Sequence, residues 1–200
     1  MLTVTAHRLQ GANVRHDSTD HHDGLIQPRL VIFHFTAISF GDTLVKFKAG
    51  TPGNRVSAHL VIARDGQIVQ FVDFNLRAWH AGQSTWNGLA DINSHSIGIE
   101  LANAGTVRKT GEQWLGEEGV AVPASEVIEA RHKHARWPMT HWHRYADAQI
   151  AACHAITAAL RDAYPIEDII GHDDIAPDRK YDPGPAFPLD AIRATALGSR

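Results

Sequence analysis

Histidine, aspartate and lysine lie close together in one short segment near the end of this 200-residue chain. Its sequence, GHDDIAPDRKYDPGP, runs from Gly171 to Pro185 and places His172 and Asp182 ten positions apart. Imidazole nitrogens and carboxylate oxygens are ligands of catalytic zinc, which also keeps one position open for water. The segment therefore predicts part of a metal site, with Lys180 as a cation beside it.

A catalytic zinc needs a third protein ligand, and His34 is the candidate. It lies near the end of residues 29–36 (RLVIFHFT), an apolar run with the composition of a buried strand. A lone histidine on a strand is more often structural than a metal ligand. His34, His172 and Asp182 therefore complete a site only if the strands that carry them are neighbours.

The segments around these residues alternate between strand and helix patterns. Three prolines, Pro177, Pro183 and Pro185, exclude a continuing helix or central strand after the apolar run 166–170. We expect strands at 29–36, 95–101 and 168–171, a hairpin of 57–63 with 67–72, and helices at 41–48, 144–164 and 189–197. The C-terminal segment is then a stiff loop at a strand end, where functional sites are common.

Two stretches show no sustained period. Residues 1–27 are polar, and we expect an irregular lead-in that wraps the domain. Residues 103–143 are rich in glycine and charge, and loops of this length are uncommon unless functional or disordered. This second stretch contains two histidine doublets: His132 with His134, and His141 with His143. A second metal site there would lack a suitably spaced third type of ligand.

Composition excludes several classes of function. The 22 acidic and 19 basic residues give a net charge of −3, so we expect neither nucleic acid nor a membrane surface as a partner. No apolar run approaches the ~20 residues of a membrane span. The single cysteine, Cys153, cannot form an internal disulfide, and its alanine-rich helical surroundings favour a buried structural role.

The motifs occur together in an order that resembles a known enzyme family. They are IFHFT, SAHLVIARDG, QIVQFV, AWHAGQS, SIGIEL and GHDDIAPDRKYDPGPAFP. The chain is similar to zinc-dependent N-acetylmuramoyl-L-alanine amidases of the type 2 family, related in fold to the peptidoglycan recognition proteins. The similarity covers roughly residues 29–102 and 144–190. It implies a single α/β domain over residues 1–200, with a central mixed sheet of about five or six strands flanked by helices.

The resemblance also implies a catalytic site. One zinc ion would be held by His34, His172 and Asp182. Zinc would lower the pKa of a water molecule toward ~7, and Glu100 would accept the water's proton and deliver it to the leaving nitrogen. Lys180 would stabilise the oxyanion. Taken without the resemblance, Glu100 could be an exposed strand-end carboxylate and Lys180 a partner in a surface ion pair.

Substrate contacts are expected from Trp79, His80 and Arg179. Trp79 and His80 resemble groove residues of the family, although packing of Trp79 in the core is an open alternative. Arg179 could hold a carboxylate of the stem peptide or remain a solvated loop charge. Residues 103–143, longer than the corresponding connection in compact family members, are expected to insert beside the groove as a lid or wall anchored by tryptophans.

The implied reaction cleaves the amide between N-acetylmuramic acid and L-alanine in peptidoglycan or muropeptides. A non-catalytic peptidoglycan receptor shares the fold, but such receptors typically lack the complete set of ligands. A structural zinc protein usually has four closed ligands, often cysteines. The absence of a signal segment favours a cytoplasmic recycling enzyme over the alternative, a phage-type or otherwise delivered lytic enzyme. The residues predict no oligomeric state.

Overall fold

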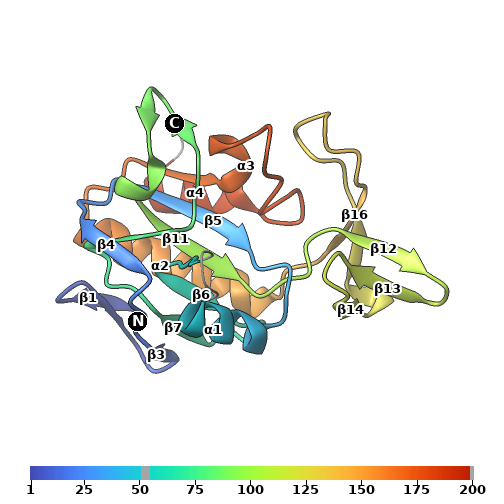
Figure 1. Cartoon of the computed structure of the whole chain (residues 1–200), viewed down its shortest axis with the longest axis horizontal. Helices are drawn as coiled ribbons and strands as arrows, with labels where there is room; N and C mark the ends of the chain where they lie inside the picture. The colour runs from blue at the N-terminus through green and yellow to red at the C-terminus, as the bar shows by residue number, and fades with distance from the viewer. Residues whose placement is uncertain (51–54, 199–200) are drawn as a thin grey trace.

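A mixed sheet of six strands forms the centre of the molecule in the computed structural model, which describes residues 1–50 and 55–198 (Figure 1). Its strands, in spatial order, are β17 (Asp168–Gly171), β5 (Leu30–Phe35), β11 (Ser96–Leu101), β6 (Leu60–Ile62), β7 (Ile68–Gln70) and β3 (Val14–His16). Neighbours pair in parallel, except for the antiparallel pair of β6 and β7. That pair is the predicted hairpin, and the predicted α/β fold is confirmed.

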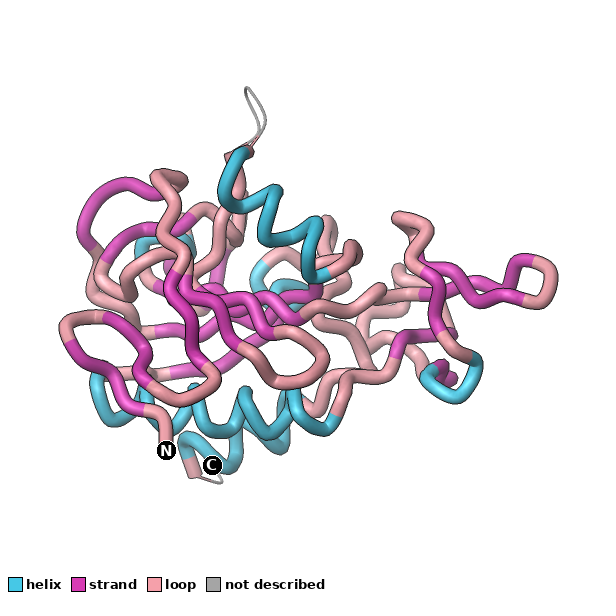
Figure 2. Tube along the Cα trace, turned by 90° about the horizontal axis from the view of Figure 1, so that it is seen from below, coloured by secondary structure: helices cyan, strands magenta, loops and turns pink. Residues whose placement is uncertain are grey.

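Helices cover both faces of the sheet. They are α1 (Phe40–Ala49), α2 (Asp147–Ala163), α3 (His172–Ile175) and α4 (Leu189–Leu197), with 3-10 turns at Ile92–Ser94 and Ala124–Glu126. Helices α2 and α4 pack against one face, and α1 lies on the other, as Figure 2 shows from below. Among the described residues, no helix is both long enough and apolar enough to cross a membrane.

Alternation along β5 divides the core into two layers. Val31 and Phe33 join the large cluster that packs against α2, whereas Leu30 and Ile32 join a smaller cluster on the opposite face. Successive side chains of a strand point to opposite faces of its sheet. His34 therefore projects on the face of Leu30 and Ile32, away from α2.

Helix α1 begins at a serine cap on the same side as His34. Ser39 Oγ accepts a hydrogen bond from the Asp42 N–H at 3.1 Å, and such a cap contributes about 1 kcal/mol. Phe47, on the inner face of the helix, is buried against β6 and β7. The helix thereby places Thr43 and Lys46 near the carboxyl ends of the central strands.

Cys153 lies in the core, as predicted. It is fully buried on α2 within the large apolar cluster, and burial raises the pKa of its thiol. A thiol of this kind is unreactive because the thiolate is the nucleophilic form.

The first 27 residues are more regular than expected. Strands β1 (Thr3–Thr5) and β2 (Arg8–Gln10) form a hairpin, β3 extends the central sheet beside β7, and β4 (His22–Leu25) pairs with β8 (Leu76–Ala78). The prediction of an irregular lead-in is therefore wrong. These strands have three or four residues and mostly exposed or half-exposed side chains, so burial imposes little alternation on their sequence.

Residues 103–143 form a small β unit rather than a long irregular loop. Strands β12 (Val107–Thr110), β13 (Gln113–Gly116) and β14 (Ala121–Val122) make an antiparallel sheet, and β15 (Val127–Glu129) pairs with β16 (His141–His143). A further hairpin, β9 (Thr85–Trp86) with β10 (Leu89–Ala90), lies outside this unit. Figure 1 shows the unit projecting from one end of the central sheet.

Candidate active site

Three parallel strands bring the predicted site residues to one edge of the sheet. The register pairs Glu100 of β11 directly with His34 of β5, and Gly171 of β17 with Phe33. His172 follows β17 immediately as the first residue of α3. The carboxyl ends of parallel strands are where α/β folds usually bind ligands.

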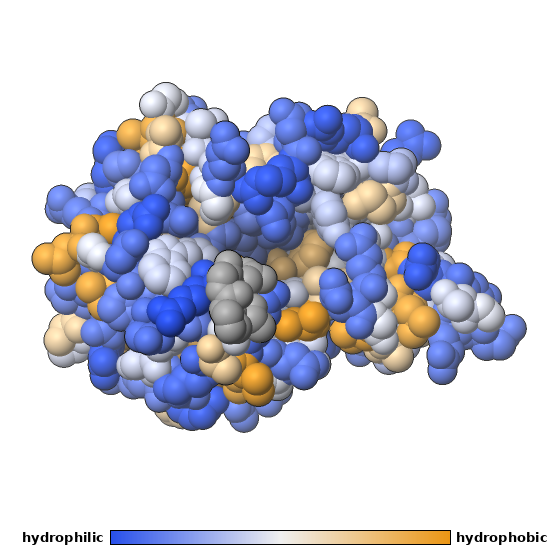
Figure 3. Space-filling view, in the orientation of Figure 1, coloured by the Kyte–Doolittle hydropathy of each residue, from blue (hydrophilic) through white to orange (hydrophobic). Residues whose placement is uncertain are grey.

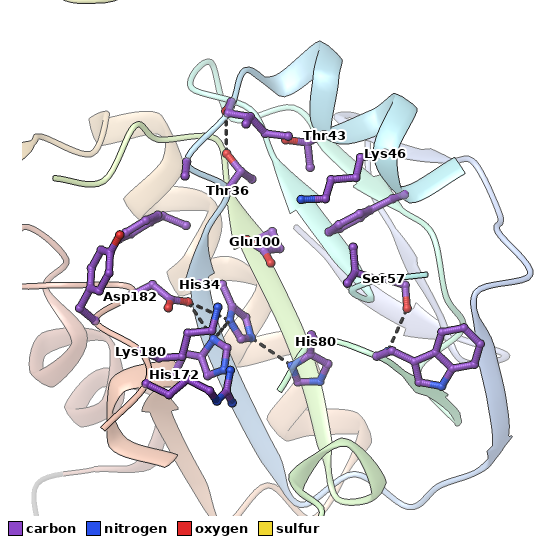
Figure 4. A pocket seen from close by; sticks show the side chains of 18 residues that line it. His34, Thr36, Thr43, Lys46, Ser57, His80, Glu100, His172, Lys180 and Asp182 are labelled. Atoms are coloured by element: carbon purple, nitrogen blue, oxygen red, sulfur yellow. Dashed lines mark hydrogen bonds and ion pairs between the residues drawn. The ribbon is translucent and has the colours of Figure 1, made fainter. Parts of the chain in front are cut away.

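His34, His172 and Asp182 form a buried cluster with their donor atoms turned toward one another (Figure 4). The two Nδ1 atoms are 2.8 Å apart, and each lies 3.0 Å from Asp182 Oδ2. Ligand atoms on one tetrahedral zinc ion are on the order of 3.3 Å apart. In the part of the chain that the structure describes, this is the one group of three or more side chains placed to hold a metal ion.

The hydrogen bonds of His172 leave its Nδ1 lone pair pointing into the cluster. His172 Nε2 lies 3.1 Å from the carbonyl oxygen of Ala81. A carbonyl oxygen only accepts, so Nε2 carries the proton and Nδ1 carries none in the neutral ring. Burial, followed by repulsion from His172 when that ring is charged, lowers the pKa of His34 to about 4, so the His34 ring is neutral at pH 7.

Asp182 completes the set as an anion. Burial acts to raise its pKa, but the positive charge that His172 and His34 carry when protonated, together with their hydrogen bonds to the carboxylate, outweighs burial and holds the pKa below its ordinary value. Two imidazole lone pairs and a carboxylate oxygen this close together repel one another unless a cation lies between them. The donor set therefore fits a metal ion of the zinc type.

His80 is a hydrogen-bond partner of His34 as well as part of the cavity wall. His34 Nε2 lies 3.0 Å from His80 Nδ1, His80 Nε2 lies 3.3 Å from Ser96 Oγ, and Ser96 Oγ donates to the carbonyl of Ile92 at 2.7 Å. Because the Ile92 carbonyl can only accept, Ser96 Oγ donates to it and accepts from His80 Nε2–H. His80 Nδ1 then carries no proton in the neutral ring and accepts from His34 Nε2–H. These hydrogen bonds leave the Nδ1 lone pair of His34 for the cluster.

Glu100, the penultimate residue of β11, has one carboxylate oxygen without a partner among the described residues. Its Oε2 is buried and has no hydrogen-bond partner among the described residues. Burial, followed by the negative charge of Asp182, raises the pKa of Glu100 well above its ordinary value, while Lys180 and Lys46 act to lower it. A buried acceptor of this kind costs roughly 1–3 kcal/mol, so the geometry suits a donor brought by water or substrate.

Lys180 and Arg179 follow α3 but have different surroundings. The side chain of Lys180 lines the cavity beside the cluster (Figure 4) and forms no ion pair within residues 1–50 and 55–198, including with Asp182. Arg179 instead uses Nη2 to donate to the carbonyl oxygens of Ala81 and Gln83, at 2.7 and 2.8 Å. Its guanidinium therefore braces one wall of the cavity.

The cavity has a volume of about 280 Å³ and extends from the cluster to α1. The indole of Trp79 lines it and also stacks on His21, with ring centroids 6.4 Å apart, so it serves both the wall and the packing behind it. Thr43, Lys46 and Phe47 of α1 also line the cavity. The face of the molecule seen in Figure 3 is largely hydrophilic and is hollowed near its centre.

Sequence reasoning missed Lys46 and Ser96. Thr43, Lys46 and Phe47 are spaced three and four apart, the spacing of one helix face, and that pattern was available in the predicted helix. Ser96 precedes Glu100 by four positions on a strand, so alternation places both on one face. None of residues 103–143 is among the described residues that line this cavity, and the predicted insertion beside the substrate groove stays a prediction.

The sequence of this chain is similar to those of known amidases. A family model described as N-acetylmuramoyl-L-alanine amidase (Amidase_2) matches residues 25–185. The 1,6-anhydro-N-acetylmuramyl-L-alanine amidase AmpD of Escherichia coli (strain K12) is 42% identical over 135 residues, which are 66% of this chain and 54% of that protein. The matched part thus spans about half the length of this curated relative.

Solved structures show the same fold. The crystal structure of a selenomethionine derivative of AmpD has a TM-score of 0.65 and 32% identity, covering 93% of this chain and 96% of that one. The E. coli amidase AmiD, in complex with anhydro-N-acetylmuramic acid-L-Ala-D-γ-Glu-L-Lys, has a TM-score of 0.64 and 26% identity, covering 99% of this chain and 66% of that one.

Proposed function

This chain belongs to the N-acetylmuramoyl-L-alanine amidase family of the Amidase_2 type, and on that premise we propose that it hydrolyses the amide between N-acetylmuramic acid and L-alanine. The observation that carries the proposal is the buried cluster of His34, His172 and Asp182 beside the unpartnered carboxylate oxygen of Glu100. A non-catalytic receptor would have no need of this arrangement.

Zinc is the proposed cofactor, with His34 Nδ1, His172 Nδ1 and Asp182 Oδ2 as its protein ligands. Two neutral imidazoles and one carboxylate leave the ion a net positive charge and a fourth position. Zinc, when bound, lowers the pKa of a water molecule toward ~7 and polarises the carbonyl under attack. The burial of all three side chains supports the proposal, since a dry site strengthens these electrostatic effects.

Glu100 is the proposed general base and acid. Its Oε2 has no hydrogen-bond partner among the described residues, so it can accept a proton from the attacking water and then return it to the departing nitrogen of L-alanine. The raised pKa of Glu100 matches this double role better than an ordinary carboxylate would, because the protonated form must persist long enough to act as an acid.

Lys180 is the proposed stabiliser of the oxyanion. Attack on the amide carbonyl concentrates negative charge on its oxygen, and the Lys180 ammonium, which forms no ion pair with any described residue, lines the cavity beside the cluster. Arg179, Trp79 and His80 are retained as proposed substrate contacts along the cavity wall. For Arg179, the contact would use the guanidinium nitrogens other than Nη2, which is engaged with carbonyl oxygens.

A soluble 1,6-anhydro muropeptide is the proposed substrate, in preference to intact peptidoglycan. This preference follows the activity named for the AmpD relatives. A small fragment also suits a cavity of about 280 Å³. A preference for the soluble fragment would support the cytoplasmic recycling role expected from the sequence. A preference for intact peptidoglycan would support a lytic role.

The test is a comparison of both substrates. Purified protein is incubated with anhydro-muropeptides and, separately, with intact peptidoglycan, each with and without a chelator, and products are identified by mass. We expect a free stem peptide beginning at L-alanine, lost with chelator, restored by zinc and formed faster from the soluble fragment. Cleavage that survives complete metal removal would refute the mechanism, and retention of muropeptide without cleavage would indicate a receptor.

A further inference from the structure

The tip of the small β unit, residues 131–137, packs against the segment that carries two of the three proposed ligands. We call that segment, residues 172–182, the ligand loop. The loop is closed at its base by a hydrogen bond from the Asp173 N–H to the carbonyl oxygen of Asp182, at 2.8 Å. Its two ends are thus held together next to His172 and Asp182, while the tip approaches from outside the cavity.

His132 contacts the neighbours of both ligands. Its Nε2 lies 3.0 Å from a carboxylate oxygen of Asp173, which follows His172, and 3.2 Å from the carbonyl oxygen of Tyr181, which precedes Asp182. One ring nitrogen therefore bridges the two ends of the ligand loop.

The protonation of His132 suits this bridge. Its Nδ1 accepts a hydrogen bond from the His134 N–H at 3.0 Å, so Nδ1 carries no proton. The proton of the neutral ring is then on Nε2, where both neighbours are acceptors. The side chains of His132 and Asp173 are 0% and 3% exposed, so neither partner can be replaced by bulk water.

Other residues of the tip contact further positions of the ligand loop. Lys133 Nζ lies 3.0 Å from Asp173 Oδ1 and 2.6 Å from Asp174 Oδ1. His134 Nε2 donates to the Asp173 carbonyl at 3.0 Å. Toward the outer end of the loop, the indole N–H of Trp137 donates to the carbonyl of Pro177 at 3.2 Å. Arg136 also pairs with Asp178, so the tip engages the loop through side chains of His132, Lys133, His134, Arg136 and Trp137.

We propose that the tip is a clamp that sets the relative positions of the two ligands on the loop, with His132 as its central positioning residue. The inference rests on the proposed function only in taking His172 and Asp182 as ligands. Since no residue of 103–143 lines the cavity, any effect of the tip on the site passes through the ligand loop. Groups that orient ligands from outside the metal's own shell typically change metal affinity by about 10–100-fold.

Zinc affinity tests the clamp without reference to activity. Wild type, His132→Ala, His132→Gln and the control His141→Ala are titrated with zinc in competition with a chromophoric chelator. His141 belongs to the same β unit, but its ring packs against Trp114 and no described contact joins it to the ligand loop. We expect about 10–100-fold weaker binding for His132→Ala and no change for the control. A glutamine amide nitrogen can reach the position of Nε2, so His132→Gln should recover most of the affinity.

The outcomes separate the clamp from the proposed function. Wild-type protein that binds no zinc would refute the proposed metal site. Wild type that binds zinc, with equal affinity in a folded His132→Ala, would refute the clamp alone. If His132→Ala does not fold, Lys133→Ala provides the test, because this partly exposed side chain contributes two contacts to the loop. A several-fold loss of zinc affinity in Lys133→Ala would support the clamp, and unchanged affinity would overturn it.

Discussion

The imidazole of His80 occupies the space above Gly98 on β11: a Cβ at Gly98 would lie 2.4 Å from His80 Cγ. Ser96 and Glu100 flank Gly98 on the same face of the strand. Ser96 accepts from His80, Gly98 makes room for its ring, and Glu100 provides the proposed base. Alternate residues of one strand therefore serve the site in three different ways.

Gly98→Ala should displace His80 and weaken zinc binding. Loss of the hydrogen bond from His34 to His80 removes the group that orients the ligand, so we expect about 10-fold lower zinc affinity, as in His80→Ala. Chelator competition measures the change. Gly41→Ala is the control, because a Cβ there meets no atom closer than 3.9 Å. Unchanged affinity in both Gly98→Ala and His80→Ala would contradict the role assigned to His80.

Zinc should stabilise the wild-type protein and fail to stabilise variants of the ligands. A ligand that binds only the folded state adds about 2.7 kcal/mol to the free energy of unfolding at 100 times its dissociation constant. We expect the melting temperature of wild type to rise with zinc and fall with a chelator, and that of His172→Ala and Asp182→Asn to be insensitive to zinc. A matching rise in these variants would place the metal elsewhere.

Glu100→Gln should lower kcat while leaving zinc binding intact. Glutamine keeps the size of the side chain but cannot accept the water's proton, and a general base contributes roughly 10²–10⁴-fold. Steady-state kinetics on an anhydro-muropeptide measure the loss, and Glu112→Gln, at an exposed position, is the matched control. A kcat within twofold of wild type would exclude Glu100 as the base.

The central fold could be predicted because its buried positions require apolar residues, and these recur at the spacing of strands and helices. Strand β5 is largely apolar on both faces, β11 carries buried Ile97, Ile99 and Leu101 at alternate positions, and α2 repeats its buried residues at helical spacing. The lead-in and the small β unit have strands of two to four residues with few buried side chains. Such short, exposed strands owe their conformation to pairing partners far along the chain, which local patterns do not reveal.

The site was predictable to the level of residue types but not of contacts. The resemblance gave His34, His172 and Asp182, and the structure brings them together. The hydrogen bond from His34 to His80 joins residues 46 positions apart, and its geometry depends on which way each ring turns. No spacing rule carries that information. The contacts of His132 with the ligand loop could not be predicted for the same reason.

Lys180→Met should reduce kcat more than it changes KM. The methionine side chain preserves length but removes the charge proposed to meet the developing oxyanion, a loss of roughly 10²–10³-fold in kcat for a single stabilising group. Lys180→Arg should retain part of the rate because it keeps the charge. A rise in KM with unchanged kcat would instead assign Lys180 to ground-state binding of the substrate.

Acid should destabilise the zinc-free protein through His59. This ring is fully buried, its Nδ1 accepts from the Gly98 N–H, and its Nε2 donates to the Leu76 carbonyl. Burial lowers the pKa of His59 from 6.5 to about 4. As pH falls from 6.5 to 4, the unfolded chain binds a proton that the folded chain does not, so up to about 3 kcal/mol of stability is lost. Above pH 6.5 the ring is neutral in both states and the effect is absent.

The measurement for His59 combines urea unfolding between pH 7.5 and 4.5 with NMR titration of its ring protons. Buried His34 and His80, whose pKa values are also lowered by burial, add to the pH dependence with the same sign, so the NMR titration is what isolates His59. We expect no protonation of His59 above about pH 5 in the folded state. A midpoint near its ordinary value would mean that the ring is solvated, and that the hydrogen bond it accepts from Gly98 does not hold β11 in place beneath His80.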